Sequence, residues 1–266
     1  MTRDLAGRRL LVTGASSGIG RCIAEQAANR GARVVLAARS ADKLGELAAD
    51  LTRRGLQAVA VPADVTRDAD RRRLLGAAVA AFGGLDALVN NAGIASFGHF
   101  ATSTEEVLRQ IMEVNFFAPA ELMRLALPLL VKGHEPAVVN VASMCGRRGM
   151  PAWAEYSASK FALCGLSEAL RAEFARFDID VLLVLPGLTR SDLPRHLLRN
   201  EGRMKIDFAS GLLPEEVAAG ALRALERNRA ETVLGSEAKW ILRVNRFWPR
   251  LVDRLTARRV RQLYAS

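Results

Sequence analysis

The chain has 266 residues, half of them hydrophobic, which allows one large α/β domain with a deep core and excludes a disordered protein. Its three cysteines, Cys22, Cys145 and Cys164, lack metal-ligand spacing to one another or to a histidine, so we expect neither a disulfide framework nor a metal site. No apolar run approaches the roughly 18 residues of a membrane-spanning helix, and no apolar signal-peptide core follows Met1. We therefore expect a cytoplasmic protein.

The formal net charge of +10 is concentrated at one end of the chain. From Ser236 onward, eight basic residues stand against Glu237 and Asp253, so this segment carries more than half of the excess. A charge of this size raises the possibility of an anionic partner, but it points to the C-terminal segment and not to the whole surface. The eight basic residues are Lys239, Arg243, Arg246, Arg250, Arg254, Arg258, Arg259 and Arg261.

Over the first 185 residues, short β-branched runs alternate with longer segments whose apolar residues recur at helical spacing. This alternation predicts parallel strands joined by right-handed helical crossovers, which is a doubly wound parallel sheet, the Rossmann fold. No repeat or long linker interrupts it, so we expect a single α/β domain over residues 1–235, followed by an extension over residues 236–266. The predicted strands are 9–13, 33–37, 58–61, 87–90, 137–142 and 181–185, and the predicted helices are 18–30, 41–54, 67–82, 104–131 and 153–177.

A glycine-rich turn follows the first predicted strand and opens the first predicted helix. Glycines permit a tight turn and a close approach of the backbone to a pyrophosphate, and the helix N-terminus offers unpaired N–H groups to it. The order of strand, turn and helix therefore predicts a dinucleotide site. Its expected contact residues are Gly14, Ser16, Ser17, Gly18, Ile19 and Gly20.

The end of the second strand bears on the choice of cofactor. An enzyme that prefers NAD usually has an acidic residue there, which binds the ribose 2′-hydroxyl. This chain has Arg39 instead, whose guanidinium suits the 2′-phosphate of NADP. We predict a preference for NADP(H); the alternative is that Arg39 is only a solvated arginine in an arginine-rich chain.

With this turn, four further segments at strand ends and in the fifth helix resemble the short-chain dehydrogenase/reductase family, over about residues 9–226. They are Asp64-Val65, Asn90-Asn91-Ala92-Gly93, Ser143, and Tyr156-Ser157-Ala158-Ser159-Lys160. The resemblance implies that Asp64 and Val65 hold the adenine and that Asn90, Asn91, Ala92 and Gly93 line the cofactor path. It also implies a nicotinamide platform at Pro186 and Gly187, with Thr189 or Ser191 bonding the carboxamide; the family usually has threonine at the position of Ser191.

Tyr156 and Lys160 are four residues apart in a helical pattern and so share one face. A neighbouring ammonium favours a phenolate, so we expect Lys160 to lower the pKa of Tyr156, the general acid or base. Ser143 is expected to bond the substrate oxygen and stabilise its developing charge. By resemblance, Lys160 also bonds the nicotinamide ribose, and Asn115 anchors a water that links Lys160 to solvent.

These residues predict an NADP(H)-dependent oxidoreductase that transfers a hydride between the nicotinamide and a ketone or secondary alcohol. By resemblance, residues 191–213 form a lid over the substrate, and their apolar content favours a hydrophobic ligand. One alternative is a 3-oxoacyl thioester reductase acting on an acidic carrier protein; another, of a different class, is an NADP(H)-sensing regulator without turnover. The resemblance also implies a homodimer or homotetramer that pairs through the helices 104–131 and 153–177.

The extension has apolar residues at helical spacing with arginines between them, and Pro249 interrupts the pattern. It predicts a pair of basic amphipathic helices. These could pack on the domain or on a partner subunit, or lie on an anionic membrane surface. No recognised nucleic-acid module accompanies the charge, so we expect no nucleic-acid partner. The apolar residues are Trp240, Ile241, Val244, Phe247, Trp248, Leu251, Val252 and Leu255.

Overall fold

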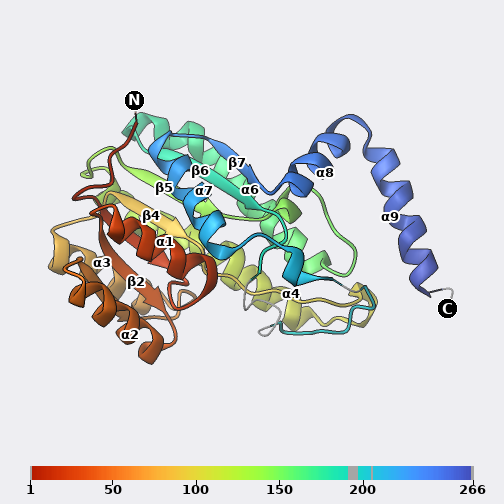
Figure 1. Cartoon of the computed structure of the whole chain (residues 1–266), viewed down its shortest axis with the longest axis horizontal. Coiled ribbons are helices and arrows are strands. Elements are labelled where there is room, and N and C mark those ends of the chain that lie inside the picture. Colours follow the sequence, from red (N-terminus) through yellow and green to blue (C-terminus); the bar gives the residue numbers. More distant parts are fainter. Residues whose placement is uncertain (1, 191–196, 205, 265–266) are drawn as a thin grey trace.

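The computed structural model describes residues 2–190, 197–204 and 206–264, and its centre is a seven-stranded parallel sheet with the strand order β3-β2-β1-β4-β5-β6-β7 (Figure 1). The order reverses between β1 and β4, which is the doubly wound topology predicted from the sequence. The Rossmann fold is thereby confirmed. The strands are β1 (Arg9–Thr13), β2 (Arg33–Ala38), β3 (Ala58–Pro62), β4 (Ala87–Asn90), β5 (Ala137–Val141), β6 (Asp180–Pro186) and β7 (Glu231–Leu234).

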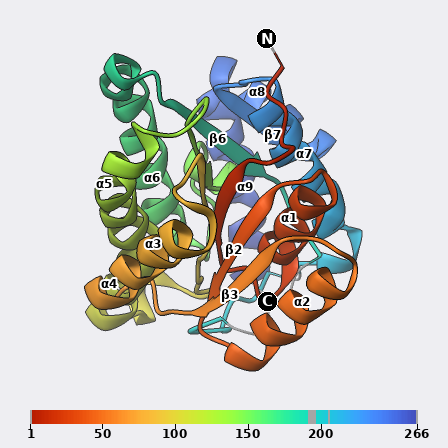
Figure 2. The ribbon, with the colours of Figure 1, turned by 90° about the vertical axis from the view of Figure 1, so that its left-hand side faces the viewer.

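Helices cover both faces of the sheet, as Figure 2 shows from the edge. Because side chains alternate along a strand, Leu10 and Val12 of β1 enter the core on one face and Leu11 enters the core on the other. The first core is closed by α1 (Gly18–Asn29), α2 (Ala41–Arg53) and α7 (Pro214–Glu226). The second is closed by α3 (Asp68–Phe82), α5 (Ala118–Leu130) and α6 (Ala154–Phe174).

Two parts of the fold differ from the sequence prediction. The segment 104–131, predicted as one helix, is divided into α4 (Glu105–Met112) and α5 by a π-helical turn over Glu113–Phe117. Beyond residue 186 the sequence pattern predicts neither α7 nor the strand β7. Pro214 followed by two glutamates at the start of α7 is a helix-start signal that could have found that helix.

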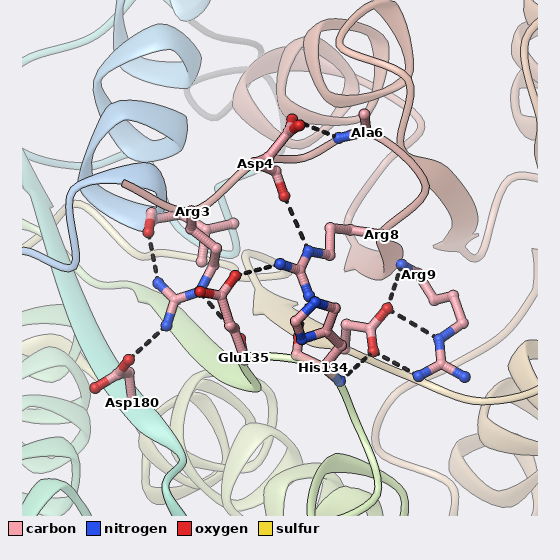
Figure 3. A network of polar contacts seen from close by, with 10 residues as sticks. Arg3, Asp4, Ala6, Arg8, Arg9, His134, Glu135 and Asp180 are labelled. Atoms are coloured by element: carbon pink, nitrogen blue, oxygen red, sulfur yellow. Dashed lines mark hydrogen bonds and ion pairs between the residues drawn. The ribbon is translucent and has the colours of Figure 1, made fainter. Parts of the chain in front are cut away.

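The amino ends of the strands are held together by an arginine network, shown in Figure 3. Buried Arg3 pairs with Asp180 at the start of β6 and donates from Nε to the Glu135 carbonyl oxygen at 3.0 Å. Buried Arg8 pairs with the Glu135 carboxylate and donates to the His134 carbonyl oxygen at 2.6 Å. The network fixes the N-terminal segment at the amino ends of the strands and leaves the opposite, carboxyl edge of the sheet for the site.

The chain ends in two helices, α8 (Ser236–Phe247) and α9 (Pro249–Tyr264), separated near Pro249. Ala238 is the only buried residue of α8, and it packs against Gly187. A Cβ added at Gly187 would lie 2.9 Å from the Ala238 Cβ, so glycine allows α8 to approach the end of β6 this closely. Helix α9 turns back from α8 and stands apart from the sheet and its covering helices (Figure 1). Among the described residues, no helix is both long and apolar enough to cross a membrane.

Candidate active site

The turn between β1 and α1 has the shape that a bound pyrophosphate requires. Gly14 has φ +68°, in the left-handed region that favours glycine. A Cβ at Gly20 would lie 2.3 Å from the Gly14 carbonyl oxygen, so only glycine allows α1 to approach the turn this closely. Helix α1 begins at Gly18, with the extended Ser17 before it, and its free N–H groups therefore face the turn. This cradle fits a dinucleotide phosphate.

Thr13 and Asn91 join this turn to the loop after β4. The backbone N–H groups of Asn91 and Ala92 donate to Thr13 Oγ1 at 2.9 and 3.1 Å. The Asn91 side-chain amide donates to the Thr13 carbonyl oxygen at 3.0 Å. The sequence indicated Asn91 and Ala92 but not Thr13, whose hydroxyl holds them. Gly93, which follows them, is exposed at the same edge.

The Asn90 side chain, which was expected to line the cofactor path, points into the sheet. Its side chain is buried and donates to Asn140 Oδ1 at 2.8 Å. Asn140 in turn donates to Ser167 Oγ at 2.8 Å. Because a buried amide needs hydrogen-bond partners, the Asn90 side chain links β4 to β5 and does not face a ligand.

Ser143, Tyr156 and Lys160 meet at the carboxyl end of β5. Ser143 lies just beyond the strand, and the Cys145 N–H donates to its Oγ at 3.1 Å. The Ser143 hydroxyl lies close enough to the Tyr156 phenol to affect its pKa. One helical turn along α6, Lys160 Nζ lies 5.8 Å from the centre of the Tyr156 ring and donates to the Val141 carbonyl oxygen at 3.1 Å. The structure thus brings these three predicted residues together.

Burial dominates the electrostatics of this group. Loss of solvent around the phenol raises the pKa of Tyr156, and the hydrogen bond from Ser143 opposes that rise. Burial also lowers the pKa of Lys160 to about 8. Desolvation therefore dominates the pKa of Tyr156 in this arrangement, and the lowering of that pKa by Lys160 stays a prediction. Tyr156 is held as a neutral proton donor.

Asn115 occupies the π-helical turn and connects two segments of the site. It accepts from the Ile94 N–H at 2.9 Å and donates to the Ile94 carbonyl oxygen at 2.9 Å. It also donates to Ser159 Oγ at 3.0 Å, and Ser159 donates to the Tyr156 carbonyl oxygen at 2.7 Å. Ser159 belongs to the segment that resembles the family, but its position alone does not indicate this role. The amide therefore sets the spacing between the loop after β4 and helix α6.

The residues expected around the adenosine lie at the ends of β2 and β3. Arg39 follows β2 with its side chain in solvent, and it has no ion pair or hydrogen bond within the described chain. The Asp64 carboxylate accepts from the backbone N–H and hydroxyl of Thr66 at 3.0 and 2.7 Å, which shapes the loop after β3. Val65 beside it is buried.

The expected nicotinamide platform begins at the carboxyl end of β6. Pro186 ends the strand, and the Gly187 N–H donates to the Leu234 carbonyl oxygen of β7 at 2.9 Å. Buried Thr189 donates its hydroxyl to the Gly187 carbonyl oxygen at 3.1 Å. Ser191 lies outside the described residues.

An apolar cluster lies against Tyr156 on the side of the predicted lid. The ring centres of Phe97 and Trp153 are 5.0 Å apart, and those of Trp153 and Tyr156 are 5.8 Å apart. Sequence patterns did not single out Phe97 or Trp153, because their role depends on contacts between distant segments. The cluster is completed by Ala95, Met150, Ala152, Leu197, Met204, Ile206 and Phe208.

A doubly wound sheet with this glycine turn and a serine, tyrosine and lysine at its carboxyl edge defines an oxidoreductase that uses a nicotinamide dinucleotide. The sequence model of the short chain dehydrogenases matches residues 8–202. The chain belongs to the short-chain dehydrogenase/reductase family.

Three similar proteins illustrate the range of the family. An uncharacterized oxidoreductase, YxnA of Bacillus subtilis, is 35% identical over 95% of this chain and 72% of its own. A 3-ketoacyl-(acyl-carrier-protein) reductase from Brucella melitensis, solved with NADH, is 29% identical with a TM-score of 0.77, covering 86% of this chain and 97% of its own. A short chain dehydrogenase from Burkholderia cenocepacia, solved with NADP, is 27% identical with a TM-score of 0.81, covering 96% and 99%.

Proposed function

We propose that the protein is an NADP(H)-dependent oxidoreductase acting on a ketone or secondary alcohol, and that its substrate is lipophilic. The observation that carries this proposal is the meeting of the Ser143 and Tyr156 hydroxyls at the end of β5, with Lys160 one turn away. A hydroxyl that donates a proton beside a second hydroxyl that binds the same oxygen is the arrangement that carbonyl reduction requires.

Each side chain has a separate task in the reduction. Ser143 Oγ accepts the Cys145 N–H, and its own hydrogen, which faces Tyr156 in this structure, can turn to the oxygen of a bound substrate. Tyr156 gives its proton to that oxygen as negative charge develops, and takes it back in the oxidation. Lys160, with a pKa of about 8, is mostly cationic at neutral pH and stabilises the phenolate that forms. A bound nicotinamide supplies or accepts the hydride.

The apolar cluster supports a lipophilic substrate. Phe97, Trp153 and Met204 lie beside Tyr156, so a carbonyl that reaches Tyr156 would have its flanking groups against apolar side chains. Burial of these flanking groups against apolar side chains favours a substrate with hydrocarbon substituents over one with charged substituents.

The preference for NADP(H) rests on Arg39. Its guanidinium is in solvent at the end of β2 without a carboxylate partner in the described chain, so its donors are available to a 2′-phosphate. The similar structures bind NADH in one case and NADP in the other, so both cofactors are used among similar folds.

The decisive measurement is NADPH consumption against a panel of steroids, retinal, aryl ketones and 3-oxoacyl thioesters, with Tyr156→Phe in parallel. We expect turnover of at least one lipophilic ketone, a loss of kcat of about 10²–10⁴-fold in Tyr156→Phe, and NADPH affinity close to wild type. Retained turnover in Tyr156→Phe would refute the assigned role.

A second candidate, reduction of a 3-oxoacyl thioester on an acidic carrier protein, is favoured by the ketoacyl reductase among the similar structures and by the positive charge of the chain. In the same panel, a kcat/KM for carrier-bound 3-oxoacyl groups well above that for free ketones would favour it. NADPH binding with no turnover of any substrate would point instead to a regulator.

A further inference from the structure

The two C-terminal helices expose a concentration of large apolar side chains. Between residues 240 and 255, five of them are largely in solvent: Trp240 (64%), Phe247 (64%), Trp248 (61%), Leu251 (46%) and Leu255 (58%). We call these five the extension surface. Exposed apolar groups gathered in this way mark an interaction site, whereas single ones are ordinary.

These side chains form a stripe on each helix, and the two stripes meet at the turn between the helices. Trp240 and Phe247 are seven residues apart on α8, which places them two turns apart on the same face. Leu251 and Leu255 are one turn apart on α9 and share a face in the same way. The rings of Phe247 and Trp248 are in contact, with centres 5.9 Å apart, and so join the two stripes at the turn between the helices.

A dense positive charge surrounds the extension surface. All eight basic side chains of the two helices are exposed, and within the described chain none of them has an ion pair. Of the two acidic residues, Asp253 is already paired, with Arg148 at 2.7 Å. Most of the positive charge is therefore available to an external anion.

We propose that α8 and α9 form a docking surface for an anionic lipid bilayer. Aromatic and leucine side chains on one face with arginines around them are the composition of helices that lie in the interface, because the apolar groups enter the acyl boundary while the guanidinium groups reach the phosphates. Pairing of this surface with the same surface of a second copy would bring two sets of eight cations together, which charge repulsion opposes.

The docking surface is tied to the catalytic loop. Arg148, five residues after Ser143, donates to Asn245 Oδ1 of α8 at 3.2 Å and pairs with Asp253 of α9. Between α9 and the start of α6 lies a groove of about 760 Å³, lined among others by Met150, Phe161 and Val260.

Met150 also packs in the apolar cluster beside Tyr156. A bilayer bound at α9 would therefore lie beside a groove that shares Met150 with this cluster, and we infer that an apolar substrate enters along it. This last consequence rests on the proposed function, whereas the docking itself does not.

The test is co-sedimentation of the full chain with vesicles of phosphatidylcholine alone and of equimolar phosphatidylcholine and phosphatidylserine. We expect binding to the anionic vesicles and little to the neutral ones. The triple variant Trp240→Ser, Phe247→Ser and Leu255→Ser should bind the anionic vesicles at least about tenfold more weakly than wild type. The triple variant Arg250→Glu, Arg254→Glu and Arg258→Glu should bind them about a hundredfold more weakly.

A matched control replaces three exposed apolar residues elsewhere, Val79→Ser, Val131→Ser and Leu213→Ser, and should bind the vesicles like wild type. Wild-type protein that stays in solution with anionic vesicles would overturn the proposal. So would an apolar triple variant that binds unchanged, or one that instead dissociates a wild-type dimer in sedimentation velocity. Because vesicle binding is read without turnover, an inactive enzyme would leave this result standing.

Discussion

At the scale of a single residue, Arg39 at the end of β2 is predicted to set the preference between NADPH and NADH. Replacing Arg39 by Asp removes the donors for a 2′-phosphate and adds an acceptor for a 2′-hydroxyl. The variant should bind NADPH about 10- to 100-fold more weakly and NADH somewhat more tightly, as fluorescence titration of each cofactor would show. Arg33→Asp, at the opposite end of the same strand, is the control and should leave the ratio unchanged. Equal affinities in wild type would contradict the preference.

Lys160 gives a second prediction, on stability against pH. Its pKa in the folded protein is about 8, below the ordinary value of 10.5, so the unfolded chain holds this proton over a range where the folded protein has released it. Stability therefore rises with pH between about 8 and 10.5, and below 8 the full cost of burying the cation is present.

The comparison is between wild type and Lys160→Met, in which this dependence is absent. Urea unfolding at about pH 7 and about pH 10 should show wild type gaining on the order of 1–3 kcal/mol relative to the variant. Cys164, whose pKa burial raises from 9.0 to about 11, stays a thiol in the folded protein while the unfolded thiol ionises, so it lowers stability above about pH 9; both proteins contain it, and its effect cancels in the comparison. A constant difference between the two proteins would mean that Lys160 titrates normally.

At the scale of the elements, the π-helical turn between α4 and α5 places Asn115 where it bonds to Ile94 and Ser159 at the site. Such turns are rare and often mark functional positions. Asn115→Ala would leave the N–H and carbonyl of Ile94 and the hydroxyl of Ser159 without their partner. We expect a loss of about 2–4 kcal/mol in stability and a fall in kcat, measured by urea unfolding and steady-state kinetics.

The exposed Asn29 at the end of α1 offers the matched control. Asn29→Ala should cost less than about 0.5 kcal/mol, because it lies outside the core and the site. If Asn115→Ala were as stable and active as this control, the turn would have no positioning role.

The positions of strands could be predicted best where a strand is buried on both faces of the sheet. β1, β4, β5 and β6 are continuous apolar runs inside a parallel sheet, and their positions follow from composition alone. β7 is short, half-exposed and at the edge of the sheet, so its pattern is weak. The π-helical turn could not be predicted, because it depends on where Asn115 finds partners from other elements.

The site shows the same division. Ser143, Tyr156 and Lys160 could be assigned because they stand in recognisable segments at predicted element ends. The roles of Thr13 and Asn140, and the direction of the Tyr156 pKa, depend on contacts and burial between segments far apart in the sequence. Short motifs therefore identified the chemistry, but not the hydrogen bonds that hold it.

At the scale of the whole molecule, the net charge of +10 sets conditions on any assembly of copies. An interface between such subunits needs apolar area to offset the repulsion. The π-helical turn packs on α6 and exposes Phe117 (49%), so we expect pairing through this face. In a two-fold interface, a charge introduced at one position appears twice.

Phe117→Glu should therefore convert a dimer or tetramer to smaller species in sedimentation velocity, whereas Val79→Glu, equally exposed on α3, should not. Salt separates this assembly from membrane docking. Screening weakens the repulsion between like-charged subunits and also weakens the attraction of the arginines to anionic lipid. Raising salt should thus strengthen the pairing of subunits while it releases the protein from vesicles. If both changed in the same direction, one of the two surfaces would be misassigned.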